Sequence, residues 1–145
     1  MNNTTDTIKV TTSTIIPTLR YHDARAAIDW LCEAFGFQEN LVVPGEEGAI
    51  RHAQLIFGNG MIMLGSVRDD EYGSKLQTPR QSAGPGSQAP YIIVSDADIH
   101  YHRAVAAGAE IVIEVQDADY GGRLYSCLDP EKNLWNFGTY DPWND

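Results

Sequence analysis

The sequence contains few basic residues and no long apolar segment. Lysine and arginine together number 10 against 20 aspartates and glutamates, which gives a net charge of −10. Nucleic acids and anionic membranes attract Lys and Arg, so this balance indicates that neither is a partner of the protein. No stretch approaches the roughly 20 consecutive apolar residues of a membrane-spanning helix. The segment MNNTTDTIKVTTST at the start also lacks the basic residues and apolar run of a secretory signal.

Cysteine is also scarce. Cys32 and Cys127 are the only two, and neither has a second Cys or a His nearby at the spacing of a zinc site. We therefore expect two buried, reduced thiols, and neither a disulfide nor a structural zinc ion. Reduced thiols without a secretory signal predict a cytoplasmic protein.

The first segment with a clear pattern is STIIPTLRYHDARAAIDWLCEAFGF (13–37). β-Branched residues over 14–21 predict a strand, and Asp23 can accept backbone N–H bonds at the start of a helix. Apolar residues then recur every three or four positions until Gly36, a residue typical of the position that follows a helix. This segment therefore predicts a strand, a turn and a helix.

The same order recurs in PYIIVSDADIHYHRAVAAGAE (90–110). An apolar strand is followed by Asp96 and then by a helix that ends before Gly108. The two helix starts are 73 residues apart, and the two glycines are 72 residues apart. We interpret this agreement as a tandem duplication of one subdomain.

Three further strands are predicted after each helix. After the first helix they are FQENLVV, AIRHAQLIFG and MIMLGS, with Asn59–Gly60 as a tight hairpin turn, and after the second they are EIVIEVQ, GRLYSCL and LWNFGTY. The pattern predicts an α+β fold of two tandem βαβββ modules. We place a flexible amino-terminal arm at 1–12, the modules at 13–66 and 90–141, and a linker or lid loop at 67–89, all in one domain overall.

One helix can cover only one face of a four-stranded sheet. The other face must be buried by curling, by the sister module or by a second chain. Two such curved mixed sheets form a cleft, and clefts are where proteins bind small molecules. The pattern therefore predicts a cleft but does not specify its chemistry.

Two segments carry a resemblance to a known family. RYHDARAAIDWLCEAFGF near the start and DPEKNLWNFGTY near the end are similar to segments of the vicinal oxygen chelate superfamily, which includes glyoxalases, bleomycin-resistance proteins and dioxygenases. The resemblance covers about residues 13–140 and implies a homodimer. The closing segment matches the family pattern Asp-Pro-x-Gly-His-x-Trp-x-Phe-Gly at Asp129, Pro130, Trp135, Phe137 and Gly138.

The turn inside that closing segment departs from the family pattern. Lys132 and Asn133 stand where Gly and His are usual. Asparagine tolerates a left-handed backbone conformation, so we expect Asn133 to replace the glycine in this turn.

The resemblance also implies where a metal would bind. Enzymes of the superfamily hold a divalent metal through His and Glu side chains on the first and last strands of each half. Carried over to this sequence, those positions are Ile16, Met63, Ala89 or Pro90, and Asn136. A catalytic metal usually needs at least three oxygen or nitrogen donors from the protein. We therefore expect no metal, no other cofactor and no catalytic residue, which points away from an enzyme without deciding the matter.

Uncharged side chains should line the cleft. In RHAQLIF, Ala53 and Leu55 form an apolar face that suits the core, so His52 and Gln54 point toward the cleft. The two methionines of MIMLGS suit an adaptable apolar floor, and a tyrosine adds one directional hydrogen bond. The full set of predicted ligand-binding residues is Ile16, Thr18, His52, Gln54, Met61, Met63, Tyr91 and Asn136.

Three functional hypotheses follow. The first is metal-independent binding of a small aromatic or amphipathic molecule by a sequestration or resistance-type protein that pairs with a second copy of itself. The alternative is a metal-dependent lyase, isomerase or dioxygenase whose metal site has moved to His52 and acidic residues of loop 66–90. The third is a catalytically silent dimerising module that modifies a partner protein, which a fully packed interior without a pocket would support. Arg20 and Arg123 could anchor an anionic ligand, although ion pairs are the commoner fate of such arginines.

Overall fold

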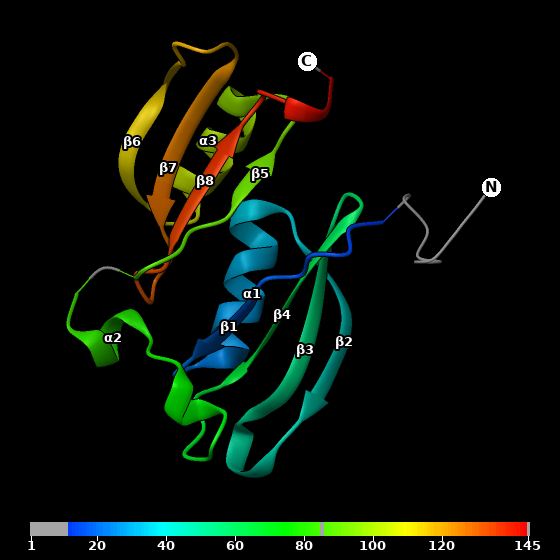
Figure 1. The fold of residues 1–145 in the computed structure, drawn as a ribbon, viewed down its shortest axis with the longest axis vertical. Coiled ribbons are helices and arrows are strands. Elements are labelled where there is room, and N and C mark those ends of the chain that lie inside the picture. Colours follow the sequence, from blue (N-terminus) through cyan, green and yellow to red (C-terminus); the bar gives the residue numbers. More distant parts are fainter. Residues whose placement is uncertain (1–11, 85, 145) are drawn as a thin grey trace.

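The computed structural model describes residues 12–84 and 86–144. The first module runs in the order β1, α1, β2, β3, β4, and the second in the order β5, α3, β6, β7, β8 (Figure 1). The bounds in the first module are Thr18–Tyr21, Ala24–Phe35, Gln38–Pro44, Ile50–Phe57 and Gly60–Ser66. In the second module they are Tyr91–Ile93, Ala97–Ala106, Glu110–Asp117, Arg123–Leu128 and Leu134–Gly138. The arm expected at 1–12 falls, apart from its last residue, outside the described residues.

Short helices occupy the connections, and the strands form two sheets of matching order. The connecting elements are η1 (Glu46–Gly48), η2 (Gly73–Lys75), α2 (Pro79–Ser82) and η3 (Pro142–Asn144). The strand orders are β1-β4-β3-β2 and β5-β8-β7-β6, and in each sheet the first and last strands of the module pair in parallel. This confirms the α+β fold of two tandem βαβββ modules. None of the helices formed by the described residues is long and apolar enough to cross a membrane.

Equivalent backbone hydrogen bonds support the duplication. The N–H of Met63 donates to the carbonyl oxygen of Pro17, and the N–H of Asn136 to that of Pro90, both at 3.0 Å. The two pairs have the 73-residue spacing of the two helix starts. Because proline has no N–H to give to a ladder, β1 begins only at Thr18, later than the sequence pattern predicted.

The ends of the helices follow the sequence. The side chains of Asp23 and Asp96 each accept the backbone N–H of the residue three positions on. Gly36 and Gly108 have φ values of 91° and 94°, which glycine adopts without strain. The turn between β3 and β4 is Gly58–Asn59, one residue before the predicted pair, because the glycine that takes the positive φ of 57° precedes the asparagine.

The two long helices pack against each other, so the modules share one core. Ile28, Leu31 and Phe35 of α1 are fully buried. The ring of Phe35 lies with its centroid 5.3 Å from that of Trp135 and 4.7 Å from that of Phe137, both on β8 of the other module. In each module the helix covers one face of the sheet, and the opposite face of the sheet stays open (Figure 1).

The turn between β7 and β8 connects the second module to the first. The buried carboxylate of Asp129 accepts hydrogen bonds from Tyr21 Oη on β1 at 2.6 Å and from Trp135 Nε1 at 3.0 Å. Burial, followed by this carboxylate, raises the pKa of Tyr21 well above its ordinary value, so the hydroxyl remains a donor. The carboxylate of Glu131 accepts the backbone N–H groups of the two residues that precede α1, both at 2.8 Å.

The left-handed residue of this turn is Lys132, with φ 73°, and the expectation for Asn133 was wrong. Asn133 instead donates its backbone N–H and its Nδ2 to the carboxylate of Asp129, at 3.0 and 3.2 Å. These bonds fix Asn133, so the residue at the family's glycine position takes the positive φ itself, at the cost of some backbone strain.

The other end of α1 is held by α3. Arg103 donates to two carbonyl oxygens in the last turn of α1, at 2.8 and 3.1 Å. His100 Nε2 lies 2.8 Å from the carbonyl oxygen of Phe35, so this nitrogen carries the proton and Nδ1 accepts from Tyr125 Oη at 2.6 Å. Burial lowers the pKa of His100 from its ordinary value of 6.5. Both ends of α1 therefore find hydrogen-bond partners in the other module.

Candidate functional site

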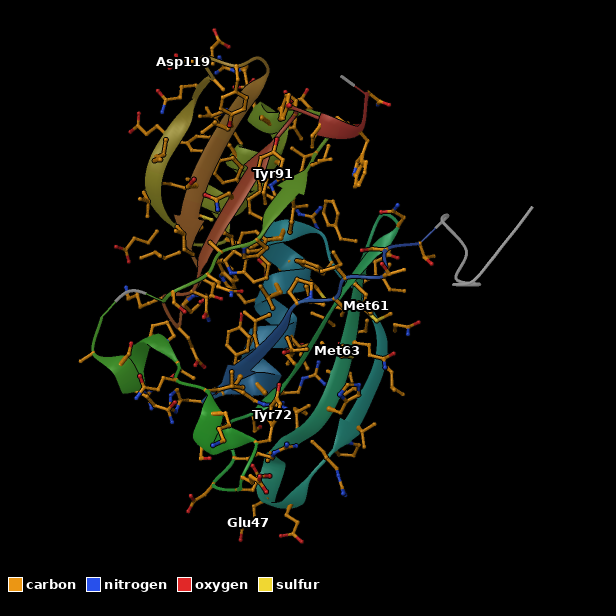
Figure 2. All side chains as sticks on the ribbon, viewed as in Figure 1. Glu47, Met61, Met63, Tyr72, Tyr91 and Asp119 are labelled. Carbon is orange, nitrogen blue, oxygen red and sulfur yellow. The ribbon has the colours of Figure 1, made fainter. Side chains whose placement is uncertain are left out.

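The open face of the first sheet carries most of the predicted site. Alternate residues of β3 are buried in the shared core, which leaves His52 and Gln54 on the open face. Gln54 and Thr18 are both register partners of Met63, so the three form a row across β3, β4 and β1. Figure 2 shows Met61 and Met63 along β4.

A matching row lies on the second sheet. Tyr91 and Ser126 are both register partners of Asn136. Asn136 Oδ1 accepts from Ser126 Oγ at 2.7 Å, and its Nδ2 donates to the carbonyl oxygen of Pro90 at 3.2 Å. Tyr91 Oη donates to the carbonyl oxygen of Tyr140 at 2.8 Å, and burial raises the pKa of this phenol. These polar groups are therefore already engaged within the chain.

The residues at the inferred metal positions do not fit a divalent cation. Met63 offers a thioether, and Asn136 offers an amide oxygen that already accepts a hydrogen bond. In the strand register, Thr18 of β1 is the partner of Met63, and Tyr91 of β5 is the partner of Asn136. Thr18 and Tyr91 come one or two residues after the first-strand positions inferred from the sequence. Neither adds an imidazole or a carboxylate, the ligands that such metals prefer.

No observation favours a metal site relocated to His52. Its Nε2 lies 3.1 Å from Gln54 Nε2. Within residues 12–84 and 86–144, no three His, Cys, Asp or Glu side chains are grouped as a metal ion would require. The relocated site therefore stays a hypothesis without structural support.

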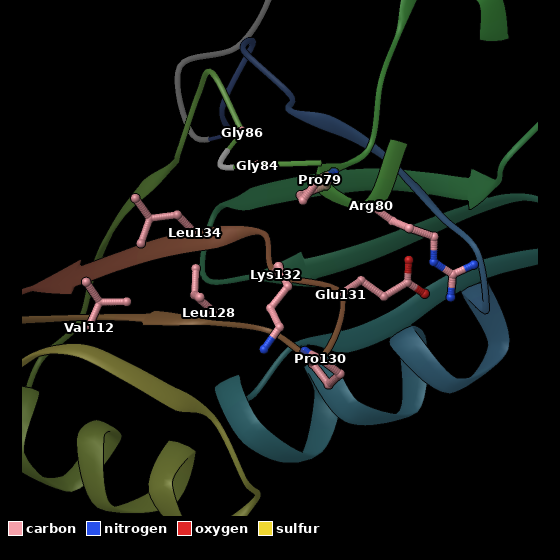
Figure 3. A pocket seen from close by; sticks show the side chains of 10 residues that line it. All are labelled: Pro79, Arg80, Gly84, Gly86, Val112, Leu128, Pro130, Glu131, Lys132 and Leu134. Atoms are coloured by element: carbon pink, nitrogen blue, oxygen red, sulfur yellow. The ribbon is translucent and has the colours of Figure 1, made fainter. Parts of the chain in front are cut away.

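The first hollow lies between the second sheet and the segment around α2, with a volume of about 670 Å³ (Figure 3). Its floor is aliphatic and consists of Val112, Leu128 and Leu134. Leu128 and Leu134 are register partners on the open face of the second sheet. The sequence alternation could have indicated Leu134, because it shares a face with Asn136. The remaining lining residues are Pro79, Arg80, Gly84, Gly86, Pro130, Glu131 and Lys132.

The second hollow adjoins the first beneath the same segment. Its volume is about 380 Å³, and it lies between the open side of β1 and the segments that flank α2, Leu76–Pro79 and Gly86–Pro90. Pro79 and Gly86 line both hollows. Of the predicted ligand-binding residues, Thr18 lines the second hollow.

A third hollow, of about 440 Å³, lies where the two modules meet. Met61 and Tyr91 line it together with apolar residues such as Phe57 and Ile93. The structure thus divides the predicted set between hollows. The five predicted residues that line none of the three are Ile16, His52, Gln54, Met63 and Asn136.

The remaining candidates have structural roles. Arg123 forms ion pairs with Asp98 at 3.1 Å and with Asp117 at 3.0 Å, which is the commoner role of such arginines. Both cysteines are free, although Cys32 is only partly buried. Burial raises the pKa of Cys127 to about 12 and also raises that of Cys32, so neither thiol is set up as a nucleophile.

Similar proteins share both the fold and the sequence pattern. A sequence model of the Glyoxalase/Bleomycin resistance protein/Dioxygenase superfamily matches residues 12–137. Uncharacterized proteins of Mycobacterium bovis and Mycobacterium tuberculosis are each 34% identical over 122 residues, which is 84% of this chain and 80% and 71% of theirs.

Solved structures with the same fold include two proteins of known name. TioX from Micromonospora sp. ML1 is 35% identical with a TM-score of 0.68, over 87% of this chain and 97% of that one. The fosfomycin resistance protein FosX from Mesorhizobium loti shares the fold, at 13% identity and a TM-score of 0.62, over 91% and 95% of the two chains. The chain described here belongs to the Glyoxalase/Bleomycin resistance protein/Dioxygenase superfamily.

Proposed function

We propose that the protein binds a small aromatic or amphipathic organic molecule, without a metal ion, in the first and second hollows. The observation that carries this proposal is the aliphatic floor of the first hollow. Val112, Leu128 and Leu134 line a space of about 670 Å³, which is within the size range of small-molecule sites. Neutral polar groups of the second hollow, such as Thr18 and Asn133, supply directional hydrogen bonds.

Sequestration is the role that such binding would serve. Holding a harmful compound requires an affinity but no reaction. The thioether and amide at the inferred metal positions support binding without a metal. Two free cysteines are consistent with a cytoplasmic protein.

A second copy of the chain would complete the site. Large apolar side chains are exposed on the open faces, among them Leu41 on β2, Ile93 on β5 and Val112 on β6. Exposed apolar surface of this kind is typical of interaction sites. Within one chain the Thr18 row and the Tyr91 row belong to different sheets, and an open face of a partner copy would cover them.

A thermal-shift screen of small aromatic antibiotics, sugars and glutathione adducts tests the proposal. A ligand at 100 times its dissociation constant stabilises the folded state by about 2.7 kcal/mol, which moves the unfolding midpoint by several degrees. Calorimetry then compares each active compound with and without EDTA. Equal affinity in both supports the proposal, and saturable binding that needs added Zn²⁺, Mn²⁺ or Fe²⁺ contradicts it.

Two matched variants locate the binding. Val112 and Ile99 are both exposed aliphatic residues, at 53% and 69%, but only Val112 lines the first hollow. Val112→Asp should weaken binding about tenfold or more, because it puts a charge on the apolar floor. Ile99→Asp should leave the affinity unchanged. Equal effects of the two substitutions would place the ligand elsewhere.

A further inference from the structure

Arg20 is an uncompensated cation on the open face of β1. Its neighbours Leu19 and Tyr21 belong to the core, so the guanidinium lies on the opposite side of the strand. Among the described residues it forms no ion pair, and its buried Nε has no hydrogen-bond partner. Arg68 and Arg123, in contrast, each pair with an aspartate. A buried donor without an acceptor is costly, so a native structure rarely keeps one without a use.

Gly65 and Tyr72 hold the guanidinium in place. Gly65 is the register partner of Arg20 on β4, and a Cβ there would overlap Arg20 Nη1 and lie 2.9 Å from the carbonyl oxygen of Arg51. The Cζ of Arg20 lies 4.9 Å from the ring centroid of Tyr72, whose hydroxyl is 3.4 Å from Thr18 Oγ1. Figure 2 shows Tyr72 beside the first sheet, well away from Tyr91.

The aromatic ring does not use the hydrogen-bonding capacity of this arginine. A ring beneath a guanidinium attracts the cation through its π face. It offers no acceptor to the N–H groups, which lie in the guanidinium plane. Among the described residues, the Nε–H of the stacked arginine therefore has no acceptor.

Arg20 also lines the second hollow. Arg20 is the one charged residue among the 14 described residues that line it, although the chain as a whole carries a net charge of −10. The other polar lining residues are neutral, and they include Thr18, Gln77, Gln88 and Asn133. A single positive charge in an otherwise neutral hollow attracts an anion there despite the acidic surface.

We propose that the second hollow is an anion subsite in which Arg20 binds the carboxylate of an amphipathic ligand. A carboxylate matches the planar donor fork of a guanidinium and can accept two parallel hydrogen bonds. The ligand's apolar body then extends into the adjoining first hollow. This inference rests on the proposed function for the apolar body and adds the charge that the ligand carries.

The experiment compares 2-naphthoate with its neutral analogue 2-naphthamide. By calorimetry, the wild-type protein should bind the carboxylate about tenfold or more tightly than the amide, because hydrogen bonds to a charged group are the stronger ones. Arg20→Gln should abolish this preference, because it should lower the affinity for the carboxylate much more than the affinity for the amide, whose carbonyl oxygen is a weaker acceptor. A preference that survives Arg20→Gln overturns the subsite.

Nuclear magnetic resonance separates this inference from the proposed function. The Nε–H resonance of Arg20 should shift saturably as acetate or 2-naphthoate is added. If acetate shifts it but neither naphthyl compound binds, the subsite stands and the apolar ligand fails. If neither anion shifts it, the subsite is overturned, whether or not the amide binds.

Two further variants control for indirect effects. Arg68 lies over the same Tyr72 ring at 5.4 Å but pairs with Asp70 at 2.9 Å, so Arg68→Gln should retain the preference for the carboxylate. Arg20→Met should unfold close to the wild-type midpoint, because removal of the unsatisfied donor offsets the lost contact with the Tyr72 ring. A midpoint well below that of the wild type would assign Arg20 to folding and overturn the proposal.

Discussion

The carboxylate of Asp129 receives hydrogen bonds from both modules. The hydroxyl of Tyr21 comes from the first module, and the indole of Trp135 and the backbone N–H groups of Glu131 and Asn133 come from the second. An alanine at this position would leave these donors without an acceptor, at about 1–3 kcal/mol for each one that stays buried. In the closing segment, Trp135 is therefore a hydrogen-bond donor to Asp129, and the bond from Tyr21 to the same carboxylate connects the two modules.

His100 makes stability depend on pH. Because burial lowers its pKa in the folded state, the unfolded state binds this proton first as the pH falls below about 6.5. The contribution of a neutral His100 is fully present above that pH and is lost progressively toward its folded-state pKa. We expect the free energy of unfolding to fall between pH 7 and pH 5 by more in the wild type than in His100→Gln.

Urea unfolding at a series of pH values measures this difference. The extra slope of the wild type can reach about 1.4 kcal/mol per pH unit, the limit for one proton. Acidic residues and the other histidines are common to both proteins and cancel in the comparison. Parallel stability curves would show that His100 is not the group responsible.

At the scale of elements, α1 depends on the second module at both ends. Its own residues supply the apolar stripe, the Asp23 cap and the Gly36 stop, and these were predicted from the sequence. The carboxylate of Glu131 before its start and the Arg103 side chain at its end were not. Capping partners so distant along the chain leave no local pattern, because packing of the two modules alone brings them together.

Removing Glu131 should weaken the start of α1. Glu131→Ala leaves two backbone N–H groups without their acceptor, and we expect a loss of about 1–2 kcal/mol in the free energy of unfolding. Faster hydrogen exchange of the amides of His22 and Asp23 should accompany the loss. Glu114→Ala, on the exposed part of β6, serves as the control and should change neither quantity.

The segment between the modules shows a different limit of sequence reasoning. Its Gly, Pro and Ser content predicted a linker or lid, and it contains η2 and α2. It has no periodicity from which contacts could be derived. The sequence therefore gave no indication that Tyr72 would lie over Arg20, or that Pro79 would line two hollows.

At the scale of the whole molecule, the shared core determines which sheet faces stay open. The order of elements and the duplication followed from spacing, and the apolar periodicity before Gly36 indicated the core-facing side of α1. The division of the predicted site did not, because alternation tells which face a residue occupies but not what covers that face. Tyr91 and Thr18 are equivalent by register, yet they line different hollows.

A pair of copies should be detectable in solution. We expect sedimentation equilibrium to give twice the chain mass of 16.0 kDa. Ile93→Asp puts a charge on an open face that the proposed dimer buries, so it should shift the protein toward the single-chain mass and weaken ligand binding. Val105→Asp, on the exposed side of α3, should do neither. A wild-type protein of single-chain mass at every concentration would contradict the dimer.

The walls that Leu76–Pro79 and Gly86–Pro90 give to the hollows are almost independent of the folding core. Of these residues only Thr78 and Pro79 are buried, and the others lie partly or fully at the surface. Randomising the others, apart from Pro90, whose carbonyl oxygen binds Asn136, would vary the lining of the hollows while the rest of the fold kept its shape. Combinatorial libraries confined to these few positions are thus a direct way to engineer capture of new compounds, and natural variants could diversify their selectivity by the same means.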